Sequence, residues 1–105
     1  MQIVLFGKDH LEISPALDHY VHDKLSRLSR HYEQHCEVRV QLGRQKTDFC
    51  ADASLHVPGQ LLHADASAST MYAAIDLLAD KLDRIVLKHK QKRLLHAPPV
   101  PGASA

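Results

Sequence analysis

Residues 71–93, MYAAIDLLADKLDRIVLKHKQKR, predict a long amphipathic helix that organises the fold of this chain. At about 100° per residue, its apolar side chains fall on one stripe that is suited to a protein core. The charged side chains beside this stripe are sorted by sign. The apolar stripe contains Met71, Ile75, Leu78, Leu82, Ile85 and Val86; the cationic flank contains Lys81, Arg84, Lys88 and Lys92; the acidic flank contains Asp76, Asp80 and Asp83.

Charge sorting of this kind favours a polyanionic partner. A solvated helix usually mixes its charges, because Glu and Lys stabilise it when they are four residues apart. A row of Lys and Arg instead can neutralise successive phosphates and release their counterions. The net charge of +1 conceals this asymmetry, since residues 70–105 carry six cations and three acids, whereas residues 1–69 carry seven cations and nine acids. A near-neutral protein with a local basic face can bind RNA.

Length and composition indicate one small globular domain. The 105 residues suffice for a single core, and the chain is 45% hydrophobic and 24% charged. No apolar run is long enough to cross a membrane, and the N-terminus lacks the pattern of a signal peptide. The two cysteines, Cys36 and Cys50, form no CxxC unit and fit a reducing compartment. We therefore expect a cytoplasmic protein without a membrane partner.

Periodicity ahead of the long helix predicts a strand, a helix and a three-stranded meander. Ser14 is a natural N-cap and Pro15 suits the first helical position, while Ser69 or Thr70 caps the second helix. Strand parity points Cys36 toward the core and Cys50 toward water, so both thiols are expected to be free. The expected strands cover residues 2–6, 37–42, 49–57 and 62–66, and the first helix runs from Pro15 to about Tyr32.

These elements define an α+β fold in the order β-α-β-β-β-α. Because the strands alternate apolar and polar residues, one face of the sheet is covered and the other is wet. Both helices should therefore pack on the same face of an antiparallel-rich, four-stranded sheet. Residues 1–93 are expected to form this domain, and residues 94–105 are expected to be a disordered Pro-rich tail.

The first helix also carries cations, at Lys24, Arg27 and Arg30. A spacing of three residues lets a helix place charges along a phosphate backbone, and two such helices on one sheet could share a basic surface. Whether they do depends on the helix crossing, which the sequence does not determine. His31 and His89 are placed near the basic faces, where acidification would add positive charge.

Three segments closely resemble the short-form ribosome hibernation-promoting factors, a family also called ribosome-associated inhibitor or protein Y. They are residues 11–33, LEISPALDHYVHDKLSRLSRHYE; residues 51–66, ADASLHVPGQLLHADA; and residues 70–92, TMYAAIDLLADKLDRIVLKHKQK. The resemblance implies a fold similar to a double-stranded RNA-binding domain. It also implies binding to the small ribosomal subunit in the channel of messenger and transfer RNA. Occupying that channel would inhibit translation in starved or stationary-phase cells.

The resemblance further implies that basic residues of both helices contact ribosomal RNA. In this sequence they are Lys24, Arg27, Arg30, Lys81, Arg84, Lys88 and Lys92. The expected tail replaces the linker and dimerising domain of long-form members, so ribosome dimerisation would require a separate ribosome modulation factor. We expect a protein that is monomeric when free and has no cofactor. Few aromatics accompany the cations, which favours recognition of RNA backbone and shape over sequence.

Other candidate sites are weaker. The H-x-x-x-H-C motif at residues 31–36 has no second ligand pair at the spacing of a structural zinc site. The pairs Asp9–His10 and His63–Asp65 stand near no nucleophile motif or glycine-rich phosphate loop. We therefore expect neither a metal site nor an enzyme. The alternative function is a protein-interaction module whose basic helix docks on an acidic partner protein.

Overall fold

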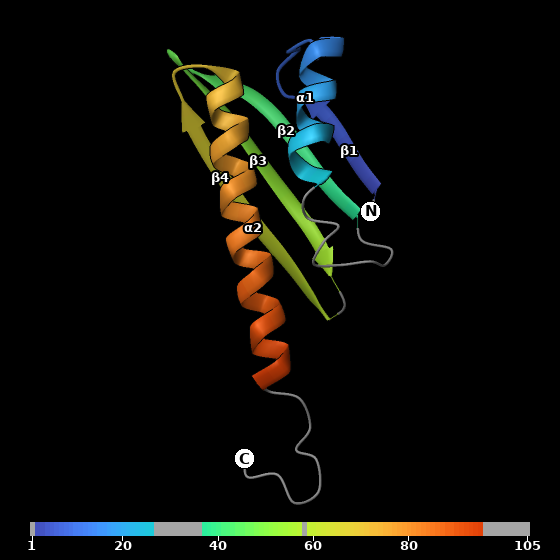
Figure 1. Cartoon of the computed structure of the whole chain (residues 1–105). Coiled ribbons are helices and arrows are strands. Elements are labelled where there is room, and N and C mark those ends of the chain that lie inside the picture. The colour runs from blue at the N-terminus through green and yellow to red at the C-terminus, as the bar shows by residue number, and fades with distance from the viewer. Residues whose placement is uncertain (1, 27–36, 58, 96–105) are drawn as a thin grey trace, which may run out of the picture.

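The computed structural model describes residues 2–26, 37–57 and 59–95, with the main chain alone for residues 90–95 (Figure 1). Its element order is β-α-β-β-β-α, which confirms the expected α+β architecture. The elements are β1 (Gln2–Gly7), α1 (Pro15–Leu25), β2 (Glu37–Gln45), β3 (Asp48–Val57), β4 (Gln60–Ala68) and α2 (Met71–Leu95).

The four strands form one mixed sheet in the order β1-β2-β3-β4. The strand pairs β2–β3 and β3–β4 are antiparallel, whereas β1 and β2 are parallel neighbours, because the chain crosses over through α1 between them. Both helices lie on the same face of the sheet (Figure 1). Helix α2 packs on β3 and β4 and also contacts α1. Strand β4, which lies under α2, is the edge strand on that side of the sheet.

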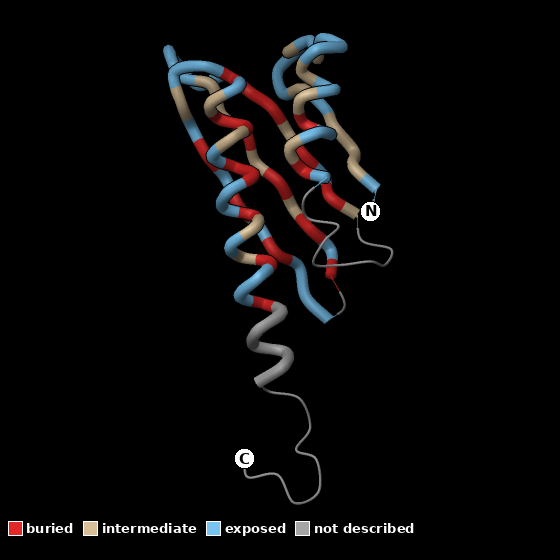
Figure 2. Tube along the Cα trace, in the orientation of Figure 1, coloured by how far each residue is buried: buried red, intermediate tan, exposed pale blue. Residues whose placement is uncertain are grey.

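The core lies between the sheet and the two helices. Buried residues alternate along β2, β3 and β4 and recur at helical spacing along α2 (Figure 2). The predicted apolar stripe of α2 is buried except at Ile85, which is half-buried. Alanine dominates the inner face of β3 and β4, so α2 can approach these strands closely. The buried alanines are Ala51 and Ala53 on β3 and Ala64 and Ala66 on β4.

Both predicted N-caps are present. The backbone N–H of Leu17 donates to Ser14 Oγ over 3.1 Å, and the backbone N–H of Ala73 donates to Thr70 Oγ1 over 3.1 Å. Each cap satisfies one of the free N–H groups of a first helical turn. Helix α1 ends at Leu25, and the expected continuation to Tyr32 lies outside the described residues.

The first two residues of the expected tail, Leu94 and Leu95, belong to helix α2. Helix α2 extends to Leu95, two residues beyond the domain boundary that we expected at residue 93. The rest of the expected tail, residues 96–105, lies outside the described part of the chain. Within that part, neither helix has the length and hydropathy that crossing a membrane requires. Cys50 is a free, half-buried thiol, and Cys36 lies outside the described residues.

Candidate nucleic-acid interface

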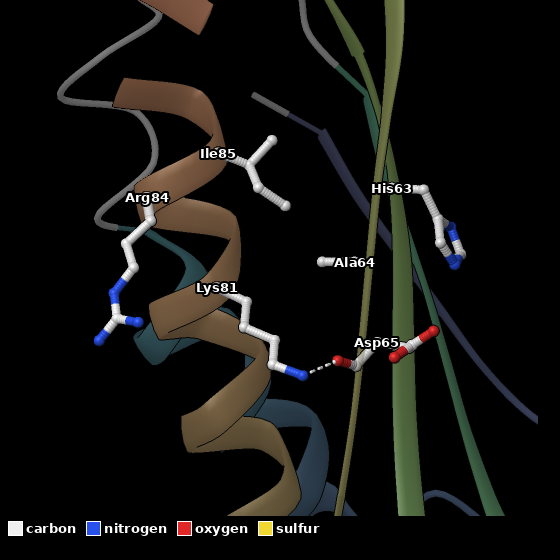
Figure 3. Close-up of a pocket in the computed structure, with 6 residues that line it drawn as sticks. All are labelled: His63, Ala64, Asp65, Lys81, Arg84 and Ile85. Atoms are coloured by element: carbon white, nitrogen blue, oxygen red, sulfur yellow. Dashed lines mark hydrogen bonds between the residues drawn. The ribbon is translucent and has the colours of Figure 1, made fainter. Parts of the chain in front are cut away.

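The two charged flanks of α2 face different neighbours. On the acidic flank, Asp76 Oδ1 accepts a hydrogen bond of 2.6 Å from the Tyr20 hydroxyl and lies 3.5 Å from Lys24 Nζ, so this flank faces α1. On the cationic flank, Lys81 Nζ donates to the main-chain oxygen of Asp65 in β4 over 2.7 Å (Figure 3). Helix α2 therefore turns Lys81 away from α1 and toward the outer edge of the sheet.

A cleft of about 350 Å³ separates this flank from β4. It is lined by His63, Ala64, Asp65, Lys81, Arg84 and Ile85. The side chains of Ala64 and Ile85 project into the space between strand and helix, whereas the His63 ring and the Asp65 carboxylate lie on the far side of β4 (Figure 3). The only part of Asp65 that meets Lys81 is its main-chain carbonyl. The cleft therefore has an apolar floor and one cation, Lys81, that reaches across it to β4, whereas the Arg84 guanidinium points away from the strand and the Asp65 carboxylate lies on its far side (Figure 3).

Lys81 is held at the edge of the sheet by a main-chain acceptor. The carbonyl of Asp65 points out of β4, where no further strand of the described sheet accepts or donates hydrogen bonds. Lys81 satisfies this open group, which is one way in which proteins protect an edge strand. An ammonium group has three N–H donors, so donors remain for an anion such as a phosphate.

Arg84 and Lys88 continue the cationic flank along exposed turns of α2. Neither has an ion-pair partner among the residues that the structure describes. At a rise of about 1.5 Å per residue, Lys81 and Lys88 are separated by about 10 Å along the helix axis. Lys92 follows in the same helix, at a position where only the main chain is described. The buried stripe of the same helix fixes the backbone from which these side chains project.

The cation of α1 does not join this row. The side chain of Lys24 is only 26% exposed, with its Nζ beside Asp76 and 5.4 Å from the centre of the Tyr20 ring. The acidic flank of α2 therefore separates Lys24 from the cationic flank. Arg27 and Arg30, the other two cations expected on this helix, lie outside the described residues. Among the described cations, the shared basic surface considered from the sequence is not formed.

Tyr20 and Asp76 form the contact that sequence reasoning missed. The hydrogen bond to Asp76 raises the pKa of Tyr20 above its usual value of 10, and burial and the negative charge of Asp76 add to this effect. The Tyr20 ring also meets Tyr72 edge-on, with 4.8 Å between the ring centres. The one sequence signal was the spacing of Tyr20 and Lys24, which places both on one side of α1.

Histidine placement corrects one expectation. His89 is 9% exposed and lies on the core side of α2, so it is not part of the cationic flank. The expectation was wrong because His89 follows the helical phase of Leu82 and Val86, which packing buries. His31, the other histidine named for this role, lies outside the described residues.

The alternative sites can also be located. No group of three His, Cys, Asp or Glu side chains in the described ranges could hold a metal ion, and the motif at residues 31–36 lies outside them. On the helix-free face, His63 Nδ1 lies 3.3 Å from Ser54 Oγ, and both groups are accessible to solvent. Asp9 and His10 are exposed residues with positive φ in the turn after β1.

Fold and charge together define a small α+β domain whose second helix carries an exposed row of cations at one edge of its sheet. Residues 4–94 match the model of the family described as Sigma 54 modulation protein / S30EA ribosomal protein, and the chain belongs to this family. This confirms the resemblance inferred from the three sequence segments.

The most similar relatives include proteins named ribosome hibernation promoting factor. That of Azotobacter vinelandii is 45% identical over 94 residues, covering 90% of this chain and 87% of the relative. That of Escherichia coli strain K12 is 41% identical over 96 residues, covering 91% of this chain and 100% of the relative.

Solved structures agree with this assignment. The crystal structure of the Thermus thermophilus Protein Y N-terminal domain has a TM-score of 0.78 at 32% identity, covering 85% of this chain and 99% of the other. A ribosomal subunit interface protein from Coxiella burnetii has a TM-score of 0.76 at 30% identity, with coverage of 87% and 99%.

Proposed function

We propose that this protein is a ribosome hibernation factor that binds ribosomal RNA of the small subunit and inhibits translation under starvation. The names of its relatives support the ribosomal role. The observation that carries the RNA-binding part is the row formed by Lys81, Arg84 and Lys88, which faces solvent beside the open edge of β4. In this proposal Arg27, Arg30 and Lys92 extend the contacts.

A row of cations on an ordered helix suits the backbone of a folded RNA. Because the apolar stripe of α2 is buried in the core, the helix backbone is already ordered, and only the side chains lose conformational freedom when the charges meet phosphates. The gain comes from counterion release and is largely independent of base sequence. Inhibition requires no chemical step, since a protein seated in the channel of messenger and transfer RNA excludes both by its volume. The protein then acts without a cofactor, as a cytoplasmic monomer.

Two further parts of the proposal concern partners. Ribosome dimerisation would need a separate modulation factor. The competing function is docking of the basic helix on an acidic protein. The exposed position of Arg84 and Lys88 is compatible with both partners, so the experiment must separate RNA from protein.

The test is co-sedimentation with purified small ribosomal subunits, followed by translation of a reporter messenger RNA in a purified system. We expect the wild-type protein to sediment with the subunits and to inhibit translation. The variant Lys81→Gln, Arg84→Gln, Lys88→Gln should lose both properties. Asp80→Asn is the matched control, because it changes an exposed charge on the other flank of the same helix.

Two results would contradict the proposal. One is a triple variant that sediments and inhibits as the wild type does. The other is a wild-type protein that stays with an acidic protein from the cell extract after nuclease has removed the RNA, and that fails to bind purified subunits. The second result would establish the protein-interaction function instead.

A further inference from the structure

A polar network joins the two helices on the side away from the cationic flank. We call it the Asp76 network, and it consists of Tyr20, Lys24, Tyr72 and Asp76. One carboxylate oxygen, Asp76 Oδ1, receives the Tyr20 hydroxyl at 2.6 Å and lies 3.5 Å from Lys24 Nζ. Lys24 also lies over the Tyr20 ring, which in turn meets the Tyr72 ring edge-on.

Asp76 is an anion with which a phosphate would have to compete for the charge of Lys24. It is the carboxylate that pairs with Lys24 Nζ, and its side chain remains 47% exposed. A partly exposed ion pair of this kind contributes little net stability, so an incoming anion can replace it. Until it is replaced, the carboxylate offsets the charge of Lys24 and repels phosphates that approach it.

This arrangement penalises RNA without a fixed shape. A flexible single strand loses conformational entropy when it places one phosphate at Lys24, and this phosphate is also repelled by the carboxylate of Asp76. A folded RNA surface can hold a phosphate at that position in advance while its other phosphates meet the cationic flank. Contact with Lys24 therefore contributes more binding free energy for a folded RNA than for a flexible single strand.

We propose that Asp76 is a specificity-determining residue: its carboxylate prevents unstructured RNA from binding Lys24, whereas a folded ribosomal RNA site can replace the carboxylate and bind Lys24. This inference rests on the proposed ribosomal function. Asp76 acts through Lys24 and Tyr20, so it is a positioning residue and not itself an RNA contact. The Tyr20 hydroxyl keeps the carboxylate oriented toward Lys24.

The test compares binding of single-stranded poly(U) and of purified small subunits, each measured by titration at constant salt. Asp76→Asn should strengthen poly(U) binding about three- to fivefold, which corresponds to the release of one exposed ion pair. Subunit binding should change by less than about twofold, because the added net charge is offset by poorer positioning of Lys24. Asp80→Asn removes the same charge without touching Lys24 and should leave the ratio of the two affinities unchanged.

A double-mutant cycle assigns the effect to Lys24. Lys24→Gln should cost little poly(U) affinity in the wild type, but should abolish the gain in the Asp76→Asn background. Asp76→Glu, which keeps the carboxylate, should retain the wild-type ratio and guards against a general effect on folding. Equal gains from Asp76→Asn and Asp80→Asn would overturn the inference, as would an equal cost of Lys24→Gln in both backgrounds.

Failure of the ribosomal function would look different. In that case the wild-type protein would not bind subunits, or the triple variant of the cationic flank would bind them as well as the wild type. If subunits are bound through the cationic flank but the cycle shows no coupling, only the role of Asp76 is wrong.

Discussion

The acidic and cationic flanks of α2 lie on one helix, yet they serve different neighbours. Asp76 on the acidic flank bonds to α1 through Tyr20 and Lys24, whereas Lys81 on the cationic flank bonds to the main chain of β4. One flank therefore uses its charge to join two helices. The other keeps Arg84 and Lys88 exposed and available to a partner. Sign sorting along a helix can thus reflect an internal contact on one side and an external one on the other.

The largest effect is expected between the two flanks, in the core. Leu82 is 0% exposed and lies on the stripe that holds both flanks in place. Leu82→Ala should lower the free energy of unfolding by about 2–5 kcal/mol, through reduced burial and the cavity left behind. Urea denaturation measures this change. A loss below about 1 kcal/mol would show that the helical phase assigned to α2 does not set the core.

Cation removal should act on binding and not on stability. The variant Lys81→Gln, Arg84→Gln, Lys88→Gln should bind small subunits about 100-fold more weakly at moderate salt. The slope of log affinity against log salt should fall by about one unit for each phosphate that the variant no longer neutralises. Glutamine retains good helix propensity, so the urea midpoint should stay close to that of the wild type. An unchanged salt slope would place the RNA-binding surface elsewhere.

The hydroxyl of Tyr20 should contribute to stability and not to the cationic flank. Tyr20→Phe removes the hydrogen bond to Asp76 and should lower the free energy of unfolding by about 0.5–1.5 kcal/mol. Tyr72→Phe is the matched control, because it keeps the ring contact with Tyr20. Subunit binding by both variants should remain near the wild-type level. Equal stability of the two variants would mean that the interhelix hydrogen bond contributes nothing.

Alkaline titration tests the same contact by its pH dependence. The pKa of Tyr20 is raised, foremost by its hydrogen bond to Asp76, so folding favours the neutral phenol. The resulting stabilisation is fully present below pH 10 and is lost as the pH rises through the folded-state pKa. Absorbance near the phenolate band should show one tyrosine ionising above its usual pKa, and Asp76→Ala, which removes both the acceptor and its charge, should remove most of this shift. A late transition that persists in Asp76→Ala would assign the shift to burial.

The smallest effect is expected outside both flanks. Residues 96–105 contain no Lys, Arg, Asp or Glu and little apolar side-chain area. Their removal should therefore leave the melting temperature and the affinity for small subunits nearly unchanged. A large loss of affinity would give this segment a role in the ribosomal site.

Local patterns predicted most of the fold, and packing between elements decided the rest. Ser14, Thr70 and the apolar stripe of α2 were predictable because caps and helical periodicity depend on neighbouring residues. The partner of Asp76 was not, since it depends on how α1 crosses α2. The hydrogen bond from Lys81 to the Asp65 carbonyl was not predictable either, because every residue type carries a main-chain carbonyl and the sequence therefore does not mark this acceptor. His89 was assigned by its proximity in sequence to cations, although its helical phase buries it.

The most direct test of the central claim asks which flank of α2 meets ribosomal RNA. Leu77 and Leu87 are similarly exposed, at 45% and 42%, and by helical phase Leu77 lies with the cationic flank and Leu87 beside the acidic one. A photoreactive group is attached to Leu77→Cys or to Leu87→Cys, in a background with Cys36→Ser and Cys50→Ser. After binding to small subunits and illumination, we expect strong cross-links to ribosomal RNA from position 77 and weak ones from position 87. Equal yields, or a stronger yield from position 87, would contradict the account.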